Sequence, residues 1–326
     1  MPDTLARNDR RAMAGHGRPI PILINREGGT AAGDDGLVAK IEAACRDVGL
    51  AAEIRLLAPT EITHAVEMHA DSAVIAIGGG DGTVRSAAAA LLGFHSEAAL
   101  AIIPLGTLNH LARQLGIPQD IPGAIELLAQ RPVRRIDVGQ VNESIFLNNA
   151  SIGLYPALVQ SRDGERRRRR IPKWMANILA ARAVMRRLRH HRLRVEAHGR
   201  SRMIRTPLLF VGNNIYSLEA GHIGQRKAID QGKLSLFALA VRSRLSTLWF
   251  AARTLFGKAD PQQDFAALEI CSDVVVSAHA GSIDVALDGE VERLQTPLRF
   301  VSLPAALPVI AAAENAAEEG QAGKPD

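Results

Sequence analysis

The sequence predicts an α/β protein of two lobes. The first is an N-terminal, doubly wound α/β domain and the second is a C-terminal, mainly antiparallel β domain, with the ligand site expected in the cleft between them. Up to about Val141, continuously apolar segments alternate with helical segments, and after it strand-like segments follow one another. A chain of 326 residues with 47% hydrophobic content is long enough for two such cores.

The N-terminal elements alternate from Pro19 onward. Strands that are apolar throughout are typical of a parallel sheet covered on both faces. The expected strands are IPILIN, AAEIRLL, SAVIAI and ALAIIP, and the expected helices cover 36–48, the residues after Thr60, 83–92 and 107–115.

The second half of the chain predicts an antiparallel lobe, because its strand-like segments succeed one another. They are FLNNASIGL, RLRVEAH, RTPLLFVGNN, KLSLFALAV, ALEICSDVVVSA, SIDVALDG and PLRFVSL, interrupted by helical stretches near 172–190 and 245–257. The predicted organisation is a disordered tail at 1–17, the α/β domain at 18–141, the β domain at 142–304 and a C-terminal tail at 305–326.

Composition excludes several classes of protein. Cys45 and Cys271 lie far apart without other ligands at metal-binding spacing, so neither a disulfide framework nor a zinc site is indicated, and a reducing compartment fits best. No stretch reaches the roughly 18 apolar residues that a membrane span needs, and the N-terminus lacks the apolar segment of a signal peptide. We therefore expect a soluble, cytoplasmic protein.

The positive charge is concentrated in one stretch. Residues 162–194 hold 13 Lys and Arg against 2 acids, a local charge of +11, whereas the rest of the chain sums to −6. Such a concentration indicates an anionic partner, namely nucleic acid, a membrane surface or a polyphosphate.

The stretch VIAIGGGDGTV places glycines at the carboxyl end of a buried strand and before a helix. Ligands of open parallel sheets bind at this edge, and the amides of a helix N-terminus favour phosphate. A plain tight turn is the alternative. No Lys follows Gly82 as a P-loop requires, and the glycine spacing does not match G-x-G-x-x-G.

The next strand is again followed by a loop with a glycine and then by a helix, in ALAIIPLGTLNHLARQLGIP. Two such loops on neighbouring strands could hold one nucleotide from both sides. GGGDGTV followed by PLGTLNHLAR resembles the diacylglycerol kinase catalytic family, the lipid kinases that include sphingosine and ceramide kinases. The resemblance extends from about residue 20 to 304 through LINREGG, RRIDVGQVN, FLNNASIGL and the late LDGE.

This resemblance implies a site for ATP and Mg²⁺ between the lobes. The residues that it assigns to the phosphates and the second loop are Asn25, Gly79, Gly80, Asp81, Gly82, Thr83, Gly106, Thr107 and Asn109. Asp81 would act through magnesium, because a carboxylate and phosphates repel unless a cation lies between them. Its alternative role is to form a turn or cap a helix.

Transfer of a phosphoryl group to a hydroxyl requires an acceptor for the proton, and SIDVALDGEVERL offers Asp288 and Glu290. As alternate residues they would face the same side of an extended segment, whereas Asp-Gly between apolar residues is also a hairpin signal. By resemblance, Glu290 is assigned as the general base, and Asp288 as a ligand of metal and water. An exchange of roles between them, or with Asp81, stays open.

Two positions depart from the family pattern. His110 stands where the family has an acid after Asn109, and Gln231 follows Asp230 where the family has Asp-Asp-Gly and a structural magnesium. A metal role is therefore doubtful at His110, and the site that Asp230 would serve is weakened or empty.

The stretch IPKWMANILAARAVMRRLRHH places apolar residues on one helical face. A basic amphipathic helix can lie on an anionic bilayer, although the same face could cover the second lobe while the arginines stay solvated. The residues expected at the membrane are Arg166, Arg167, Arg168, Arg169, Arg170, Lys173 and Trp174. Nucleic acid is not expected, because no aromatic residues interleave with the arginine run.

Together these observations predict an ATP-dependent lipid kinase acting on diacylglycerol or a related lipid, attached peripherally to the inner face of the membrane. The alternatives are a sphingoid or ceramide kinase, an enzyme similar to NAD kinase, and a non-catalytic protein that binds ATP or lipid. The lipid and the oligomeric state, a homodimer included, are left open.

Overall fold

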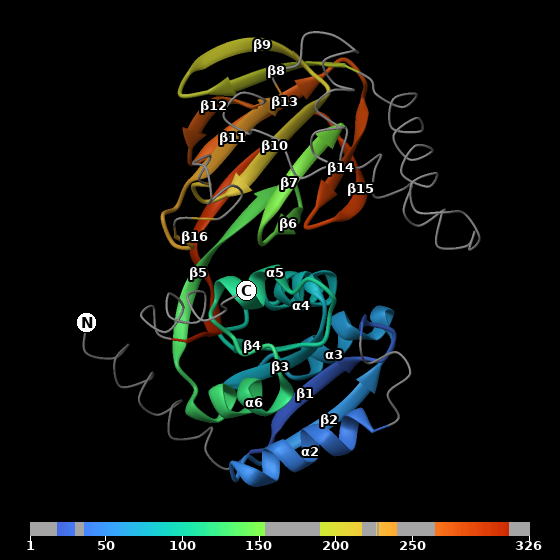
Figure 1. Ribbon diagram of the computed structural model, residues 1–326. Coiled ribbons are helices and arrows are strands. Elements are labelled where there is room, and N and C mark those ends of the chain that lie inside the picture. Colours follow the sequence, from blue (N-terminus) through green and yellow to red (C-terminus); the bar gives the residue numbers. More distant parts are fainter. Residues whose placement is uncertain are drawn as a thin grey trace, which may run out of the picture. The chain divides into compact units, whose positions relative to one another are not determined.

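The computed structural model describes residues 18–29, 36–153, 190–216, 226, 228–239 and 265–312. The chain divides into two compact units, which are Met1–Ile136 with Ala305–Asp326 (unit 1) and Asp137–Pro304 (unit 2) (Figure 1). The strands β5 (Val133–Val141) and β16 (Leu298–Ile310) each begin in one unit and end in the other.

Unit 1 alternates strands and helices as expected. Its elements are β1 (Ile20–Asn25), α2 (Leu37–Asp47), β2 (Ala52–Leu57), η3 (Pro59–Glu61), α3 (Ile62–Met68), β3 (Val74–Gly79), α4 (Asp81–Gly93), β4 (Ala99–Pro104), α5 (His110–Gln114) and α6 (Ile121–Gln130).

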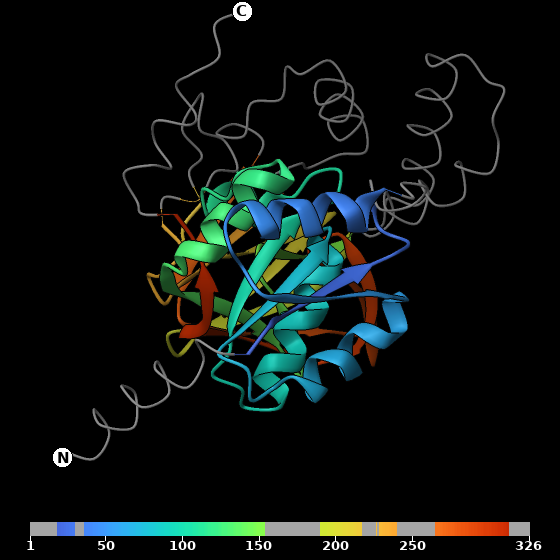
Figure 2. The ribbon, with the colours of Figure 1, turned by 90° about the horizontal axis from the view of Figure 1, so that it is seen from below.

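The sheet of unit 1 is parallel, with the order β2-β1-β3-β4. Every residue of β1, β3 and β4 is buried. Helices α2 and α6 cover one face and α3 and α4 cover the other (Figure 2). The prediction of a parallel sheet enclosed by helices is therefore confirmed, and the long apolar runs follow from burial on both faces.

Two helices differ from the expectation. Helix α6 was not predicted, although its start is well marked, because the side chain of Asp120 accepts a hydrogen bond of 2.9 Å from the amide of Gly123 and a proline lies in the first turn. Helix α5 covers only His110–Gln114 instead of 107–115, because Asn109 adopts the left-handed conformation with φ of 49° and cannot continue a helix.

The expected tail at 305–326 is wrong for its first part. Residues up to Ile310 continue β16, where Leu307, Val309 and Ile310 are buried and Val309 pairs with Leu100 of β4 in parallel. The apolar side chains near the end of the chain therefore complete the core of unit 1 instead of belonging to a solvated tail.

Unit 2 is built from antiparallel strands, as predicted. They are β6 (Ser144–Phe146), β7 (Asn149–Gly153), β8 (His191–Ala197), β9 (Arg200–Thr206), β10 (Leu208–Asn213), β11 (Leu234–Leu239), β12 (Phe265–Cys271), β13 (Asp273–Ala278), β14 (Ser282–Leu287) and β15 (Glu290–Gln295). One sheet has the order β12-β11-β10-β7-β14-β15, and a second group has the order β16-β13-β8-β9. Phe146 and Phe300 pack edge to face in the core, with ring centroids 6.4 Å apart.

Several expectations fall on residues that are not described. They are the N-terminal tail, the helix near 245–257 and, apart from its last residue, the helix near 172–190. Within the described ranges, no helix is both long enough and apolar enough to cross a bilayer.

Both cysteines are buried thiols, Cys45 on α2 and Cys271 on β12. Burial, followed by the charge of Glu42, raises the pKa of Cys45. Burial, followed by the charges of Glu269 and Asp273, raises the pKa of Cys271 to about 11. Since the thiolate is the reactive form, little of it exists near neutral pH in the folded protein.

We therefore expect both thiols of the native protein to react with a disulfide reagent at about pH 8 at least tenfold more slowly than in denaturant. The variants Cys45→Ser and Cys271→Ser, each with one thiol left, report on unit 2 and unit 1 respectively. A native thiol that reacts as fast as free cysteine would show that its element is open to solvent.

Candidate functional site

The two glycines that end β3 are packed against neighbouring side chains of unit 1. A Cβ atom on Gly79 would lie 2.7 Å from the Cβ of Thr83, and one on Gly78 would lie 3.1 Å from side-chain carbons of Ile24 and Leu105. These two glycines therefore make room for neighbouring side chains, a requirement that the sequence analysis had assigned to the approach of a ligand.

The loops after β3 and β4 touch through their main chains. A Cβ atom on Gly106 would lie 2.4 Å from the Cα of Gly80 and 2.5 Å from Oδ1 of Asn109. The two strands are in register, Gly79 beside Pro104, and the amide of Leu105 donates a 3.1 Å hydrogen bond to the carbonyl of Gly79. The two predicted phosphate loops are thus brought together, because a side chain at Gly106 would force them apart.

The carboxylate of Asp81 caps a helix other than its own. Its two oxygens accept hydrogen bonds of 3.2 Å from the amides of His110 and Leu111, which begin α5. The capping role that the sequence left open for Asp81 is therefore found, but on a helix that follows almost 30 residues later.

The start of α4 has no side-chain cap of this kind. Gly80 is its N-cap residue and makes no side-chain cap hydrogen bond, while Asp81, in the first turn, is directed to α5. The positive end of α4 thus carries main-chain amides without a protein side chain to cap them, and this arrangement favours a bound anion such as phosphate.

Asn25 and Asn109 flank this helix end. The amide Nδ2 of Asn25 donates a 2.9 Å hydrogen bond to Oγ1 of Thr83, which ties the end of β1 to α4. Asn109 is 7% exposed, and its Nδ2 donates a 2.9 Å hydrogen bond to the carbonyl of Gly106. Oδ1 of Asn109 is a buried acceptor without a hydrogen-bond partner. The neighbouring Thr107 and His110 are exposed.

The described residues do not form a cage for a metal ion, because no group of three or more His, Cys, Asp or Glu is brought together in them. They do fit Mg²⁺ carried by a nucleotide, since protein sites for this complex commonly supply only one or two carboxylates. Each oxygen of Asp81 keeps lone-pair capacity beyond its single hydrogen bond. Asp81 could therefore cap α5 and hold magnesium at once.

In unit 2, Asp288 holds a turn of main chain. Its Oδ2 accepts a 2.6 Å hydrogen bond from the amide of Leu147, and its Oδ1 accepts bonds of 2.7 and 3.0 Å from the amides of Asn148 and Asn149. Its own amide donates a 2.9 Å bond to the carbonyl of Asn149. The LDGE and FLNNAS motifs of the sequence are therefore joined by one carboxylate, which is a strong acceptor for convergent amides.

Asp288 and Glu290 do not share one face of a strand, as the sequence analysis had considered. Asp288 and Gly289 have φ of 48° and 97° and form the two-residue turn between β14 and β15, so the hairpin alternative is the correct one. Glu290 is the first residue of β15 and is exposed.

Residues that the sequence analysis did not single out surround the FLNNAS segment. Arg226 donates hydrogen bonds of 2.8 Å to the carbonyl of Leu147 and 3.0 Å to Oδ1 of Asn148. The hydroxyl of Tyr216 donates a 2.9 Å bond to the carbonyl of Asn148. Their signal in the sequence was weak, because neither residue belongs to a recognisable motif.

Burial and nearby charges shift the pKa values of both Arg226 and Tyr216. Burial lowers the pKa of Arg226, and the charges of Tyr216, Asp288 and Asp137 oppose that change. Burial raises the pKa of Tyr216 from its usual value near 10. Tyr216 therefore keeps its proton at neutral pH, as its role as a hydrogen-bond donor requires.

Asp230 lies in a turn held by other residues. The amide of Gly232 donates a 2.5 Å hydrogen bond to the buried Asp137, and the amide of Gln231 donates a 2.9 Å bond to Oδ1 of Asn214. Asp230 itself is exposed and belongs to no cluster of metal ligands among the described residues. Asp137 is the acid that organises this turn, and the sequence showed it only as one polar residue in an apolar strand.

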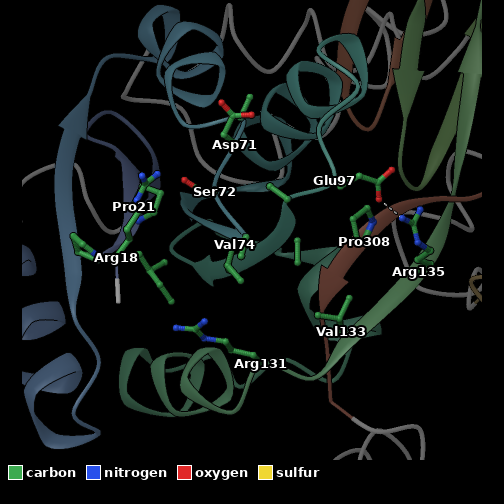
Figure 3. Close-up of a pocket in the computed structure, with 16 residues that line it drawn as sticks. Arg18, Pro21, Asp71, Ser72, Val74, Glu97, Arg131, Val133, Arg135 and Pro308 are labelled. Carbon is green, nitrogen blue, oxygen red and sulfur yellow. Dashed lines mark hydrogen bonds and ion pairs between the residues drawn. The ribbon is translucent and has the colours of Figure 1, made fainter. Parts of the chain in front are cut away.

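A cavity of about 890 Å³ opens in unit 1 at the opposite end of the sheet from the glycine loops, where β1, β3 and β4 begin. Arg131 extends from the end of α6 toward its middle, and Glu97 and Arg135 form an ion pair at its rim (Figure 3). Open parallel sheets bind nucleotides at the carboxyl ends of their strands, so this cavity is not the predicted phosphate site. The predicted membrane residues, Arg166–Arg170, Lys173 and Trp174, lie outside the described residues.

The contact between the two loops can be tested by adding one methyl group. Gly106→Ala should lower the free energy of unfolding by about 1–3 kcal/mol, because its Cβ would overlap main-chain atoms of Gly80. The control Gly93→Ala, on α4 with no atom within 4 Å of the added Cβ, should leave stability unchanged or raise it by up to about 1 kcal/mol. Urea unfolding measures both variants, and equal stabilities would disprove the contact.

Asp288→Asn should destabilise unit 2 by about 2–4 kcal/mol, because the new amide group would face main-chain donors that need an acceptor. Asparagine tolerates the left-handed conformation of this position, so the turn itself is preserved. The matched control is Asp284→Asn on β14, whose exposed ion pair with Arg293 contributes at most about 1 kcal/mol. An Asp288→Asn protein as stable as its control would rule out the anchoring role.

Comparison with known proteins supports the assignment that the motifs suggested. The family model of the diacylglycerol kinase catalytic domain matches residues 19–141. A protein of Pseudomonas aeruginosa named "Probable lipid kinase YegS-like" is 51% identical over 81 residues, which are 25% of this chain and 26% of that protein. The aligned segment thus spans about a quarter of the relative's length.

Two solved structures share the fold of the chain. A diacylglycerol kinase from Bacillus anthracis matches with a TM-score of 0.66 and 22% identity over 90% of this chain and 97% of that one. Yeast NADH kinase, crystallised with NADH, matches with a TM-score of 0.53 and 10% identity over 94% and 88% of the two chains. The chain therefore has the fold of the solved diacylglycerol kinase, and residues 19–141 belong to the diacylglycerol kinase catalytic domain family.

Proposed function

We propose that this protein is a lipid kinase that transfers the γ-phosphoryl group of ATP, bound with Mg²⁺, to a hydroxyl of diacylglycerol or a related lipid. The observation that carries the proposal is the uncapped N-terminus of α4, next to the main-chain contact of Gly80 with Gly106. The match of residues 19–141 to the family model of the diacylglycerol kinase catalytic domain supports the proposal as well.

Phosphates are held by the first turn of α4 in this proposal. The amides there and the positive end of the helix dipole stabilise negative charge without any side-chain movement. Asp81 contributes its remaining lone pairs to magnesium, and the unpartnered Oδ1 of Asn109 accepts a hydrogen bond from the nucleotide or a magnesium-bound water. Phosphoryl transfer relies on such positioning and charge neutralisation.

The proton of the lipid hydroxyl goes to Glu290. This carboxylate is exposed at the start of β15, beside the rigid Asp288–Gly289 turn, whereas both oxygens of Asp288 are engaged by main-chain amides. A proton acceptor must be accessible to its substrate, and Glu290 is exposed whereas Asp288 is half-buried, so Glu290 suits this role better than Asp288. Asp288 then acts by fixing the turn that precedes Glu290.

The membrane is the expected place of reaction, since the acceptor is a lipid. In this proposal the basic residues Arg166–Arg170, Lys173 and Trp174 attach the protein peripherally to an anionic surface.

A second candidate function is the phosphorylation of a dinucleotide. It is favoured by the shared fold with yeast NADH kinase, although the identity of 10% speaks for the fold alone. Incubation with labelled ATP, Mg²⁺ and either a lipid panel or NAD separates the two functions. Labelled lipid supports the first proposal, labelled dinucleotide supports the second, and ATP binding without either product contradicts both.

Glu290→Gln should lower turnover on the lipid substrate by about 10²–10⁴-fold, because the variant has no group to accept the proton. The affinity for ATP, measured by equilibrium binding, should stay within about twofold of the unmodified protein.

The matched control is Glu143→Gln, an exposed carboxylate in the turn between β5 and β6. It removes the same charge from unit 2 and should keep full activity. A Glu290→Gln enzyme as active as this control would remove Glu290 from the mechanism.

A further inference from the structure

The strands β8 and β9 of unit 2 form a hairpin at the end of a sheet. All seven positions pair, from His191 opposite Thr206 to Ala197 opposite Arg200, and the turn residues His198 and Gly199 both have positive φ. Among the strands that the structure describes, β9 pairs with β8 alone and is the last strand of the sheet (Figure 1).

The hairpin has one buried and one solvent-exposed face. Leu193, Val195 and Ala197 are buried in the core of unit 2. Since directly paired residues share a face, the opposite side presents three rows across the strands. These rows are Arg192 with Arg205, Arg194 with Met203 and Glu196 with Ser201, and all of these residues except the half-buried Glu196 are exposed. Arg200 and Arg202 of β9 are exposed as well, but they pair with Ala197 and Val195 and so belong to the other face.

The exposed face therefore carries three arginines, Arg192, Arg194 and Arg205, with a single acid, Glu196. That acid pairs with Arg194 at 2.7 Å. Arg192 and Arg205 lie directly opposite each other, and like charges in this position destabilise an antiparallel pair. The side chain of neither residue has a hydrogen bond or ion pair with another described residue, so no acid in the described part of the chain offsets their repulsion.

Protection of an exposed edge against aggregation is the simplest structural explanation for such charges. It accounts for arginines on β9, which is the edge strand. It does not account for Arg194, because this part of β8 is paired on both sides, with β9 and β13. Nor does it account for Met203, which is 66% exposed within the arginine cluster.

We propose that the exposed face of the β8–β9 hairpin is a docking surface for an anionic lipid bilayer. Its arginines complement lipid phosphates, and Met203 provides one apolar side chain that can enter the interface. The choice of a bilayer over other polyanions rests on the proposed lipid-kinase function and on the hairpin's lack of Phe, Tyr and Trp side chains, which stack on bases in nucleic-acid sites.

The repulsion between Arg192 and Arg205 gives the test a double readout. In the full-length variant Arg192→Gln/Arg205→Gln, binding to vesicles should weaken about 25-fold, at roughly fivefold per arginine. The same variant should unfold in urea at an equal or higher concentration than the unmodified protein, because an unfavourable pair is gone. A purely structural role for the two arginines predicts the opposite change in stability.

The measurement is co-sedimentation with vesicles of phosphatidylcholine, with and without phosphatidylglycerol, in the absence of ATP. Two controls accompany it. Arg192→Lys/Arg205→Lys keeps the charge and should keep most of the binding, and Arg46→Gln/Arg55→Gln removes two exposed arginines of unit 1 and should bind as the unmodified protein does.

Binding that needs phosphatidylglycerol and falls only in the Arg192→Gln/Arg205→Gln variant supports the docking surface. Equal binding of this variant and the unit 1 control overturns it, as does tighter, arginine-dependent binding to duplex DNA. Since no turnover is measured, a protein that lacks lipid-kinase activity but shows the hairpin-dependent binding would refute the proposed function and leave the docking surface standing.

Discussion

The main-chain contact between Gly80 and Gly106 is the constraint on which the predicted phosphate site depends. Two parallel strands deliver their following loops to the same edge of the sheet, but only residues without a Cβ allow these loops to meet. Once they meet, Asp81 of one loop can reach the helix that starts after the other. Glycines that the sequence suggests for the approach of a ligand thus serve first to join the two loops that would hold it.

Aspartates organise both units through main-chain amides. Asp81 receives two amides in unit 1 and Asp288 receives three in unit 2. In each case the carboxylate replaces water for donors that have no partner in regular secondary structure, and this explains why an acid is needed at a turn whether or not chemistry occurs there. Because main-chain amides already engage both aspartates, the motifs suggest more catalytic work for them than their hydrogen bonds allow. Glu290 is exposed, whereas both aspartates are half-buried.

The sequence predicted the strands β1, β3 and β4 of unit 1 well, because burial on two faces leaves long apolar runs that few other structures require. It did not predict β5, β6, β9 and β15, whose residues do not form long apolar runs. It failed where a single residue overrides the pattern, as when the left-handed Asn109 shortens α5. It also failed where segments far apart in the sequence pair with each other, as when residues near Ile310 extend β16 beside β4. The partners of Asp81 and Asp288 belong to this second kind, since hydrogen bonds across about 30 and 140 residues leave no local periodicity to detect.

Local structural rules are broken at the two surfaces to which we assign partners. Helix α4 starts without a side-chain cap although an aspartate lies in its first turn, and Arg192 faces Arg205 across an otherwise regular hairpin. Each arrangement is unfavourable for the isolated protein, yet neighbouring elements obey the same rules, as α6 does with its Asp120 cap and β8 with the pair of Arg194 and Glu196. In the two proposals, an anion at either surface would remove the local cost, because a phosphate would cap the free amides and lipid headgroups would lie between the two guanidinium groups. Both departures thus favour the same kind of partner, an anion.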